Sequence, residues 1–527
     1  MLTVRNADSR PLARRGPAIW RFGGRGCIGL LLTAVLLAGC ASVPVVEDEA
    51  SGPASSEQIR IVGARGPLSK RQSAAILKRL AAQAPNAGAL ERHLAVEQAV
   101  ADTPLVAGNR VSILRDGDQT FPAMFAAIRS AQHFLYLEYY IFEDVSCDGQ
   151  QLGDLLESKA RAGVQIYVIY DGIGSIGTPS SFFDRLKAAG VHIIQFNSPN
   201  PLRAGWHLTL NKRDHRKMLV ADGKVVILGG VNLSSTYESA PGSSGDKANP
   251  GADGGRSAPT SSSGDKSSSG EASRSPPAAP PAGRPALPQT PAPAANDHEV
   301  WHDTDLQIAG PVVVQLEKLF EEHWQEQDGP PMHDESDAGP APPEGNEVVR
   351  IIGSTPKDLK SRFYVTVLSA IRNAEQSVWI TAAYFVPTHQ EMEDLLHAAR
   401  RKVDVRLLLP SQSDSHAALE VQHSHYGKLL RAGVKIYERD DGILHSKTIV
   451  VDGVWSIVGS SNFDQRSVLF NDEVDAVVLG KETGTQLTDG FRQDLQHAQP
   501  VELNTWNRRS TLTKLREQFW RLWQKLL

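Results

Sequence analysis

The stretch DHRKMLVAD, residues 214–222, follows the pattern H-x-K-x4-D, and the pattern recurs as HSKTIVVD at residues 445–452. In both copies a glycine follows the aspartate. An apolar run then leads to Gly-Gly-Val-Asn at 229–232 in one copy and to Gly-Ser-Ser-Asn at 459–462 in the other. One such motif can arise by chance, whereas two copies with the same downstream spacing indicate a duplicated functional unit.

The motif residues are His215, Lys217, Asp222, His445, Lys447 and Asp452. In each copy the histidine and the lysine are two positions apart, so on a strand their side chains would share one face. The aspartate has the opposite parity and precedes a glycine, a pair that is typical of a type I′ hairpin turn. We therefore expect the aspartates to complete the catalytic motifs in a mainly structural role.

These residue types suit the transfer of a phosphodiester. A neutral imidazole can attack phosphorus and form a phospho-histidine, and a second, protonated imidazole can donate to the leaving alkoxide and later deprotonate the acceptor. The two lysines, together with Asn232 and Asn462, would stabilise the charge that develops on the phosphoryl oxygens. The alternative is a pair of unrelated basic surface hairpins, and the repeated spacing argues against it.

Three further segments accompany the motifs: EYYIF at 138–142, YFVP at 384–387 and NFDQRS at 462–467. With them the chain resembles the phospholipase D superfamily, and within it the bacterial cardiolipin synthases. The resemblance implies an α/β fold of two similar lobes, each a mixed, mostly parallel sheet flanked by helices. It also implies a phosphatidyltransferase that forms cardiolipin from phosphatidylglycerol, with His215 as the nucleophile, His445 as the general acid and base, and Arg466 near the phosphate.

The two halves align beyond the motifs, which indicates an internal repeat. Residues 134–142 match 378–386, and in the alignment Asp303-Thr304-Asp305-Leu306 falls opposite residues 471–474. Because a reacting histidine needs a partner that fixes its tautomer, we expect Glu473 to orient His215 and Asp305 to orient His445 across the lobe interface. Ordinary carboxylates at strand starts are the alternative. The expected supporting residues are Asn232, Asn462, Glu473, Asp305, Arg466 and Ser460.

The N-terminus has the features of a bacterial export signal. Arginines precede an apolar run at 28–37 that is short for a transmembrane helix, and the run ends in Leu-Ala-Gly-Cys. We expect residues 1–39 to be a lipoprotein signal peptide and Cys40 to be lipidated. The enzyme would then be anchored in the cell envelope, at the outer membrane facing the periplasm. An uncleaved anchor is the alternative.

The rest of the chain divides by composition. We expect a tether and helical lead-in at 40–107, a first lobe at 108–330, a linker at 331–346, a second lobe at 347–500 and a C-terminal helix at 501–527. Residues 240–297 are rich in Ser, Gly, Pro and Ala and interrupt the first lobe, so they are predicted to be a disordered insert. The C-terminal segment is amphipathic, and packing on a lobe is favoured over membrane insertion.

The sequence also limits the alternatives. A net charge of −5 does not favour nucleic acid as a partner, so a superfamily nuclease is less favoured than a phospholipase D that hydrolyses its lipid. Two complete motifs argue against a non-catalytic envelope protein.

We expect a phospholipid and a membrane as partners, and neither cofactor nor metal. The HEVWH stretch at 298–302 matches H-E-x-x-H, but it leads into a strand and lacks the helix that a zinc site needs.

Overall fold

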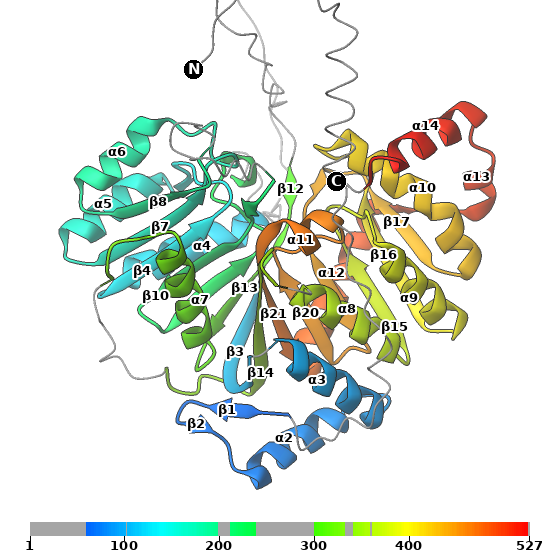
Figure 1. Cartoon of the computed structure of the whole chain (residues 1–527), viewed down its shortest axis with the longest axis horizontal. Coiled ribbons are helices and arrows are strands. Elements are labelled where there is room, and N and C mark those ends of the chain that lie inside the picture. Colours follow the sequence, from blue (N-terminus) through cyan, green and yellow to red (C-terminus); the bar gives the residue numbers. More distant parts are fainter. Residues whose placement is uncertain are drawn as a thin grey trace, which may run out of the picture.

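The computed structural model describes residues 59–101, 103–198, 211–238, 300–332, 341–358 and 361–524. Two lobes lie side by side and meet along β3, β13, β14 and β21 (Figure 1). The predicted signal peptide, Cys40, the insert at 240–297 and half of the predicted linker lie outside the described residues. None of the helices in the described part is long and apolar enough to cross a membrane.

The first lobe is a mixed sheet with the strand order β8-β7-β4-β10-β11-β13-β3. Its strands are β3 (Leu105–Arg115), β4 (Phe134–Tyr139), β7 (Gln165–Asp171), β8 (His192–Phe196), β10 (Lys217–Ala221), β11 (Val225–Gly229) and β13 (Thr304–Ala309). Its helices are α4 (Asp116–Ser130), α5 (Leu152–Arg161), α6 (Ser180–Ala188) and α7 (Val313–Glu326). The chain alternates strands with helices between β4 and β8, as the sequence pattern predicts.

The second lobe repeats this order as β17-β16-β15-β19-β20-β21-β14. Its strands are β14 (Glu347–Ser354), β15 (Ser377–Thr381), β16 (Asp404–Pro410), β17 (Lys435–Arg439), β19 (Thr448–Val451), β20 (Trp455–Gly459) and β21 (Asn471–Leu479). Its helices are α8 (Arg362–Asn373), α9 (His389–Arg400), α10 (His416–Ala432), α11 (Gln465–Leu469) and α12 (Lys481–Asp494). The predicted two-lobe α/β repeat is therefore present.

The expectation of mostly parallel sheets needs correction. Only β4-β7-β8 in the first lobe and β15-β16-β17 in the second are parallel within these two sheets. The remaining neighbours, which include both motif hairpins, are antiparallel. The alternation of strands and helices, which indicates parallel pairing, stops before the motif in each lobe. The strands from the motif onward pair with their neighbours antiparallel.

The lobes share one structural unit. β3 and β14 pair antiparallel and join the two sheets. One hydrophobic core draws on both lobes, since it contains Phe320 of α7, Val349 of β14 and Leu487 of α12. Apolar side chains that are buried between lobes, and not only within them, stabilise the pair as a whole. The relative position of the two motifs is therefore fixed by packed secondary structure.

Each motif aspartate ends a strand in the predicted turn. Asp222 has φ 50° and Gly223 has φ 63°, and the Lys224 N–H donates to the Ala221 carbonyl at 3.0 Å, as a type I′ turn requires. The Asp222 carboxylate accepts the backbone N–H groups of residues 132–134 at 2.8–3.0 Å. Asp452 does the same for residues 375–377. Both aspartates therefore anchor the neighbouring strand, β4 or β15.

Both ends of the described chain pack against the second lobe or the strands that join the lobes (Figure 1). The lead-in consists of β1 (Ile61–Gly63), β2 (Gly66–Pro67), α2 (Lys70–Ala81) and α3 (Ala87–Ala101). Ser69 caps α2 in a capping box with Gln72. The C-terminal part consists of β22 (Ala498–Pro500), α13 (Leu503–Asn507) and α14 (Thr511–Arg521). The predicted C-terminal helix is thus two helices, and α14 packs on α10 through the Arg516–Glu420 ion pair.

Candidate active site

The two motif histidines line one cavity between the lobes. The cavity has a volume of about 350 Å³. The first lobe contributes Tyr140, His215 and Asn232 to its wall, and the second lobe contributes the matching residues Tyr384, His445 and Asn462. Tyr140 and Tyr384, which the repeat aligns, therefore occupy matching positions in the cavity wall. Both rings stack edge-on near their histidines, at centroid distances of 5.3 Å and 6.2 Å.

Each histidine is held by a strand of the other lobe. The short strand β9 (Arg213–Asp214) pairs with the start of β21, and the His215 N–H donates to the Asp472 carbonyl at 2.9 Å. In the same way β18 (Ile443–Leu444) pairs with β12 (Trp301–His302), and the His445 N–H donates to the His302 carbonyl at 2.7 Å. The two lobes thus exchange backbone hydrogen bonds immediately before each motif.

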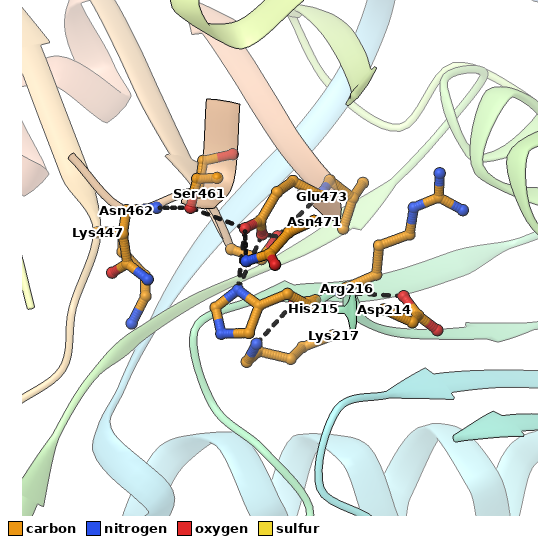
Figure 2. Close-up of polar contacts among 12 residues, drawn as sticks. Asp214, His215, Arg216, Lys217, Lys447, Ser461, Asn462, Asn471 and Glu473 are labelled. Carbon is orange, nitrogen blue, oxygen red and sulfur yellow. Dashed lines mark hydrogen bonds and ion pairs between the residues drawn. The ribbon is translucent and has the colours of Figure 1, made fainter. Parts of the chain in front are cut away.

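The predicted contact between Glu473 and His215 is present. Nδ1 of His215 lies 2.9 Å and 3.1 Å from the two carboxylate oxygens of Glu473 (Figure 2). Three side chains of the second lobe donate to the same carboxylate: Ser460 at 2.5 Å, Ser467 at 2.8 Å and Asn471 at 3.1 Å. Since Nδ1 faces Glu473, Nε2 of His215 is the nitrogen available to the cavity.

The expected pairing of Asp305 with His445 is wrong, because Asp303 takes that place. Nδ1 of His445 lies 2.7 Å from Oδ2 of Asp303, and the Tyr237 hydroxyl lies 2.9 Å from the same nitrogen and 3.2 Å from the same oxygen. Asp305 instead accepts the Val231 N–H at 3.0 Å. Burial and the neighbouring charge of Asp303 raise the pKa of Asp305 well above its usual range, which favours a neutral side chain.

The error lies in the register of the repeat. Asp305 lies opposite Gly229 in the β11–β13 pair, whereas Asp475, and not Glu473, lies opposite Gly459 in the β20–β21 pair. Asp475 also accepts the Ser461 N–H, as Asp305 accepts that of Val231. The true equivalents are therefore Asp305 with Asp475 and Asp303 with Glu473. A shift of two residues keeps every side chain on its face of the strand, so alternation could not reveal it.

Burial and neighbouring cations set the charges of the site. Burial, with help from Lys217 and Lys447 and against Glu473, lowers the pKa of His215 to about 4. Burial and Lys447 likewise lower the pKa of His445, against Asp303. Burial, together with the Lys447 ammonium and against Glu473, lowers the pKa of Lys217 to about 7. The surroundings of the two imidazoles therefore favour their neutral forms, and an anion bound between them would stabilise the protonated forms.

The carboxylates behind the rings remain ionised. Burial would raise the pKa of Glu473, but the nearby His215 and Lys217 outweigh it and lower the pKa below its usual range. Lys447 and His445 lower the pKa of Asp303 in the same way, against burial. Each lysine also donates to the backbone carbonyl of its own histidine, at 2.6 Å in the case of Lys217. Each lobe thus presents an imidazole, an ammonium and, from its neighbour, a carboxylate.

The remaining predicted residues divide into those in the cavity and those outside it. Arg466 lines the cavity and donates to the Asn211 carbonyl at 3.2 Å. Asn232 accepts the Ile141 N–H at 3.1 Å, and Asn462 is buried beside His445 in the cavity wall. Asp222 and Asp452 lie in the hairpin turns at the other end of the motif strands. They do not line the cavity, in agreement with their parity in the sequence.

Several residues of the site were not predicted. They are Asp303, Tyr237, Trp301 and Asp414. A signal for Tyr237 exists, because it follows Asn232 at the same spacing at which Ser467 follows Asn462. Both residues support the carboxylate behind a histidine. Because tyrosine and serine are chemically different, a single sequence does not reveal that Tyr237 and Ser467 occupy equivalent positions.

A buried charged cluster lies behind the first motif. Among the described residues, Glu138, Asp214 and His323 form the group whose ligand atoms lie close enough to hold a metal, within 4.8 Å of one another. Arg216 reaches into the same cluster and lies 3.2 Å from Glu138, to which His323 is also bonded at 2.7 Å. The guanidinium thus supplies the positive charge that two buried carboxylates need. In the second lobe the position of Asp214 is taken by Leu444, within an apolar cluster.

In the part of the chain that the structure describes, the other possible metal ligands are not brought together. Trp301 and His302 form strand β12, and His302 pairs with Asp116 at 3.1 Å, so the described part of the HEVWH stretch lacks the helix of a zinc protease. His298 lies outside the described residues. Cys147 is a buried free cysteine at the end of β5 (Ser146–Cys147), away from the cavity wall.

Duplicated lobes that each deliver an H-x-K motif to a common cavity define a phospholipase D-like protein, and comparisons with known proteins agree. A family model described as "Cardiolipin synthase, PLD-like domain" matches residues 124–239 and 367–495. The cardiolipin synthase of Alkalihalophilus pseudofirmus is 30% identical over 426 residues, which cover 80% of this chain and 73% of that protein. Cardiolipin synthase A of Pseudomonas syringae pv. syringae is 30% identical over 404 residues, covering 76% and 71% of the two chains.

A solved structure supports the fold. The phosphatidylserine synthase of Haemophilus influenzae Rd KW20 superposes with a TM-score of 0.55 at 10% sequence identity, over 83% of this chain and all of the other. The chain belongs to the cardiolipin synthase family of the phospholipase D superfamily. It is accordingly an enzyme of the phosphatidyltransferase class.

Proposed function

We propose that the protein forms cardiolipin by transferring a phosphatidyl group from one phosphatidylglycerol to another, with release of glycerol. One observation carries the proposal: two imidazoles from different lobes, each backed by a carboxylate of the opposite lobe, line one cavity. A single phosphorus atom bound between them would have a nucleophile on one side and a proton donor on the other, as in-line displacement requires. The similarity to cardiolipin synthases supports phosphatidylglycerol as the substrate.

In the first step, Nε2 of His215 attacks phosphorus. A nitrogen–phosphorus bond forms, the bond from phosphorus to the glycerol oxygen breaks, and the leaving oxygen takes the proton from Nε2 of His445. The lowered pKa of His215 supports its role as nucleophile, because the ring is neutral at physiological pH. The negative phosphodiester would raise the pKa of His445 and so allow that ring to carry the proton it donates.

In the second step, the hydroxyl of another phosphatidylglycerol gives its proton to His445 and attacks phosphorus. The bond to His215 breaks, and both imidazoles return to their first state. The ammonium groups of Lys217 and Lys447 would stabilise the charge on the non-bridging oxygens. Glu473 and Asp303 keep the Nδ1 protons in place, so that the reactive nitrogens face the substrate.

The location of the enzyme belongs to the same proposal. A lipid on Cys40 would hold the catalytic lobes at the membrane that contains their substrate. Mass spectrometry of the purified envelope protein would detect a diacylated N-terminus at Cys40, and fractionation would place it in the outer membrane. An intact N-terminal segment in the mature protein would exclude this anchor and leave the chemistry of the cavity unaffected.

Product analysis tests the reaction itself. The full chain, in mixed micelles with phosphatidylglycerol and without added metal, should form cardiolipin and glycerol in equal amounts. Phosphatidic acid as the sole lipid product would identify water as the acceptor and make the protein a hydrolytic phospholipase D. Cleavage of DNA without any lipid product would identify a nuclease.

The two histidine roles can be separated with a phosphodiester whose leaving group is a nitrophenolate. Such a leaving group needs no proton, so His445→Asn should still form the phospho-histidine and release about one nitrophenolate per site in a burst. His215→Asn should give no burst, because the nucleophile is missing. Stopped-flow absorbance measures the burst, and the opposite result would exchange the two roles.

A further inference from the structure

The outer face of α14 is apolar and exposed. Leu512, Leu515, Phe519 and Leu522 follow at spacings of three and four residues, and each side chain is between 54% and 79% exposed. These spacings place the four side chains along one stripe of the helix. The opposite face is covered, because Glu517 is buried in an ion pair with Arg509 and Trp520 packs on the second lobe.

The helix lies at the mouth of the catalytic cavity. Trp520 packs against the cluster of Val386, Ala418 and Val421, and both Val386 and Ala418 line the cavity. On the first lobe, Ile176 is 71% exposed in the loop that follows β7. The neighbouring Ser175 donates to the carbonyl of the cavity residue Tyr140 at 3.1 Å. Exposed apolar side chains therefore flank the cavity on both lobes.

The charge around the stripe is positive. Between residues 503 and 524 the chain carries five basic residues and a single acid, Glu517, although the protein as a whole has a net charge of −5. Arg508, in the turn after α13, and Lys514 and Arg521, on α14, are exposed. A helix with an apolar face and basic flanks suits the headgroup region of an anionic bilayer.

We propose that α14 docks on the surface of an anionic phospholipid bilayer, with its apolar stripe among the acyl chains and its basic residues at the headgroups. The proposal rests on the phospholipid substrate proposed above. This orientation directs the cavity mouth toward the membrane, so that a headgroup can reach the two imidazoles while its acyl chains remain in the bilayer. Four side chains along about 15 Å of helix form a smaller surface than a stable dimer interface needs, so a second copy of the chain fits the stripe less well.

Photo-crosslinking tests the docking directly on the full chain. Benzoylphenylalanine replaces Leu515 or Phe519, and the matched control carries it in place of Val314, which is 48% exposed at the start of α7. β13 begins near the catalytic site and ends at Ala309 on the far side of the sheet, and α7 begins shortly after that end. Val314 therefore lies away from the cavity mouth. On phosphatidylglycerol vesicles, the α14 positions should give roughly tenfold more lipid adduct than the control. Adducts between two protein copies, or lipid adducts no more frequent than at Val314, would overturn the proposal.

A second measurement separates docking from chemistry. The double variant Leu515→Glu/Phe519→Glu should turn over phosphatidylglycerol vesicles roughly tenfold more slowly than wild type. It should retain wild-type activity on short-chain phosphatidylglycerol in monomeric solution, and Val314→Glu should retain both activities. Equal loss on both substrates would contradict the docking role. If the enzyme formed no cardiolipin but α14 still gave lipid adducts, the proposed reaction would fail while the docking surface stood.

Discussion

At the level of single residues, Oδ2 of Asp303 lies 2.7 Å from Nδ1 of His445 and so holds the tautomer of that ring. Asp303→Asn should lower kcat by about 10²–10⁴, because an amide cannot hold His445 in the required tautomer. Asp305→Asn should change kcat by less than about tenfold, since its raised pKa means that an amide resembles the neutral acid already present. Steady-state kinetics with circular dichroism as the control for folding measures both. A larger loss for Asp305→Asn would restore the original assignment.

There is a physical reason why the sequence did not distinguish Asp303 from Asp305 as the partner of His445. The H-x-K pairs, the glycines and the asparagines repeat with constant spacing, so the sequence predicts that they meet at one site. The carboxylates behind the rings do not repeat, because a glutamate in one half is matched by an aspartate in the other. Asp303 and Asp305 have the same parity on their strand. Only the hydrogen-bond register of β13 and β21 distinguishes them.

The pH profile follows from the charges of the proposed mechanism. Groups with a lowered pKa lose their protons at lower pH than usual, and both His445 and Lys217 must be protonated to act. We expect kcat/KM to rise with pH near 4 as His215 becomes neutral, and to fall once His445 loses its proton. Above about pH 7, loss of the Lys217 proton should steepen the fall of log kcat/KM from a slope of −1 to −2.

Lys217→Arg is the matched control for this profile, because a guanidinium stays protonated throughout the range. The variant should be slower, and its slope above pH 7 should return to −1. A wild-type slope of −1 up to pH 9 would show that Lys217 keeps its proton in the free enzyme.

At the scale of secondary-structure elements, the motif aspartates tie each hairpin to the neighbouring strand. Asp222→Ala should lower the free energy of unfolding by about 3 kcal/mol, since buried N–H groups at the start of β4 lose their acceptor. Urea unfolding measures this change. Lys224→Ala is the control: its ammonium lies 4.0 Å from Asp222 at the surface, and its loss should cost less than about 1 kcal/mol. Equal effects of the two variants would contradict the anchoring role.

The elements show where sequence patterns suffice and where they do not. Alternating strands and helices between residues 134 and 196 predict β4, β7 and β8 and their parallel order. β3 and β13 pair antiparallel although they are far apart in the sequence. No pattern within either segment predicts this pairing. The short strands β9 and β12 are defined by their partners in the other lobe, so local propensity could not identify them.

For the protein as a whole, we predict that the segment at 240–297 is dispensable for the site, because the second lobe forms its half of the cavity without an equivalent segment. The ring centroids of Tyr237 and Trp301, which lie before and after residues 240–297 in the chain, are 5.5 Å apart. A Gly/Ser linker of about eight residues can close this gap. Replacing residues 240–297 with it should leave the melting temperature and the cardiolipin yield close to wild type, as measured by calorimetry and product analysis. A loss of either would assign the insert a part in folding or catalysis.

The support of each histidine by the opposite lobe also has a consequence for biosynthesis. Glu473, the residue behind His215, lies on β21, near the end of the catalytic lobes. Because domains fold from the N-terminus during synthesis, a ribosome that has released the first half exposes an imidazole without its carboxylate. The nascent chain therefore carries no competent phosphodiester site until translation is nearly complete, which delays any attack on membrane lipids until the finished protein has folded.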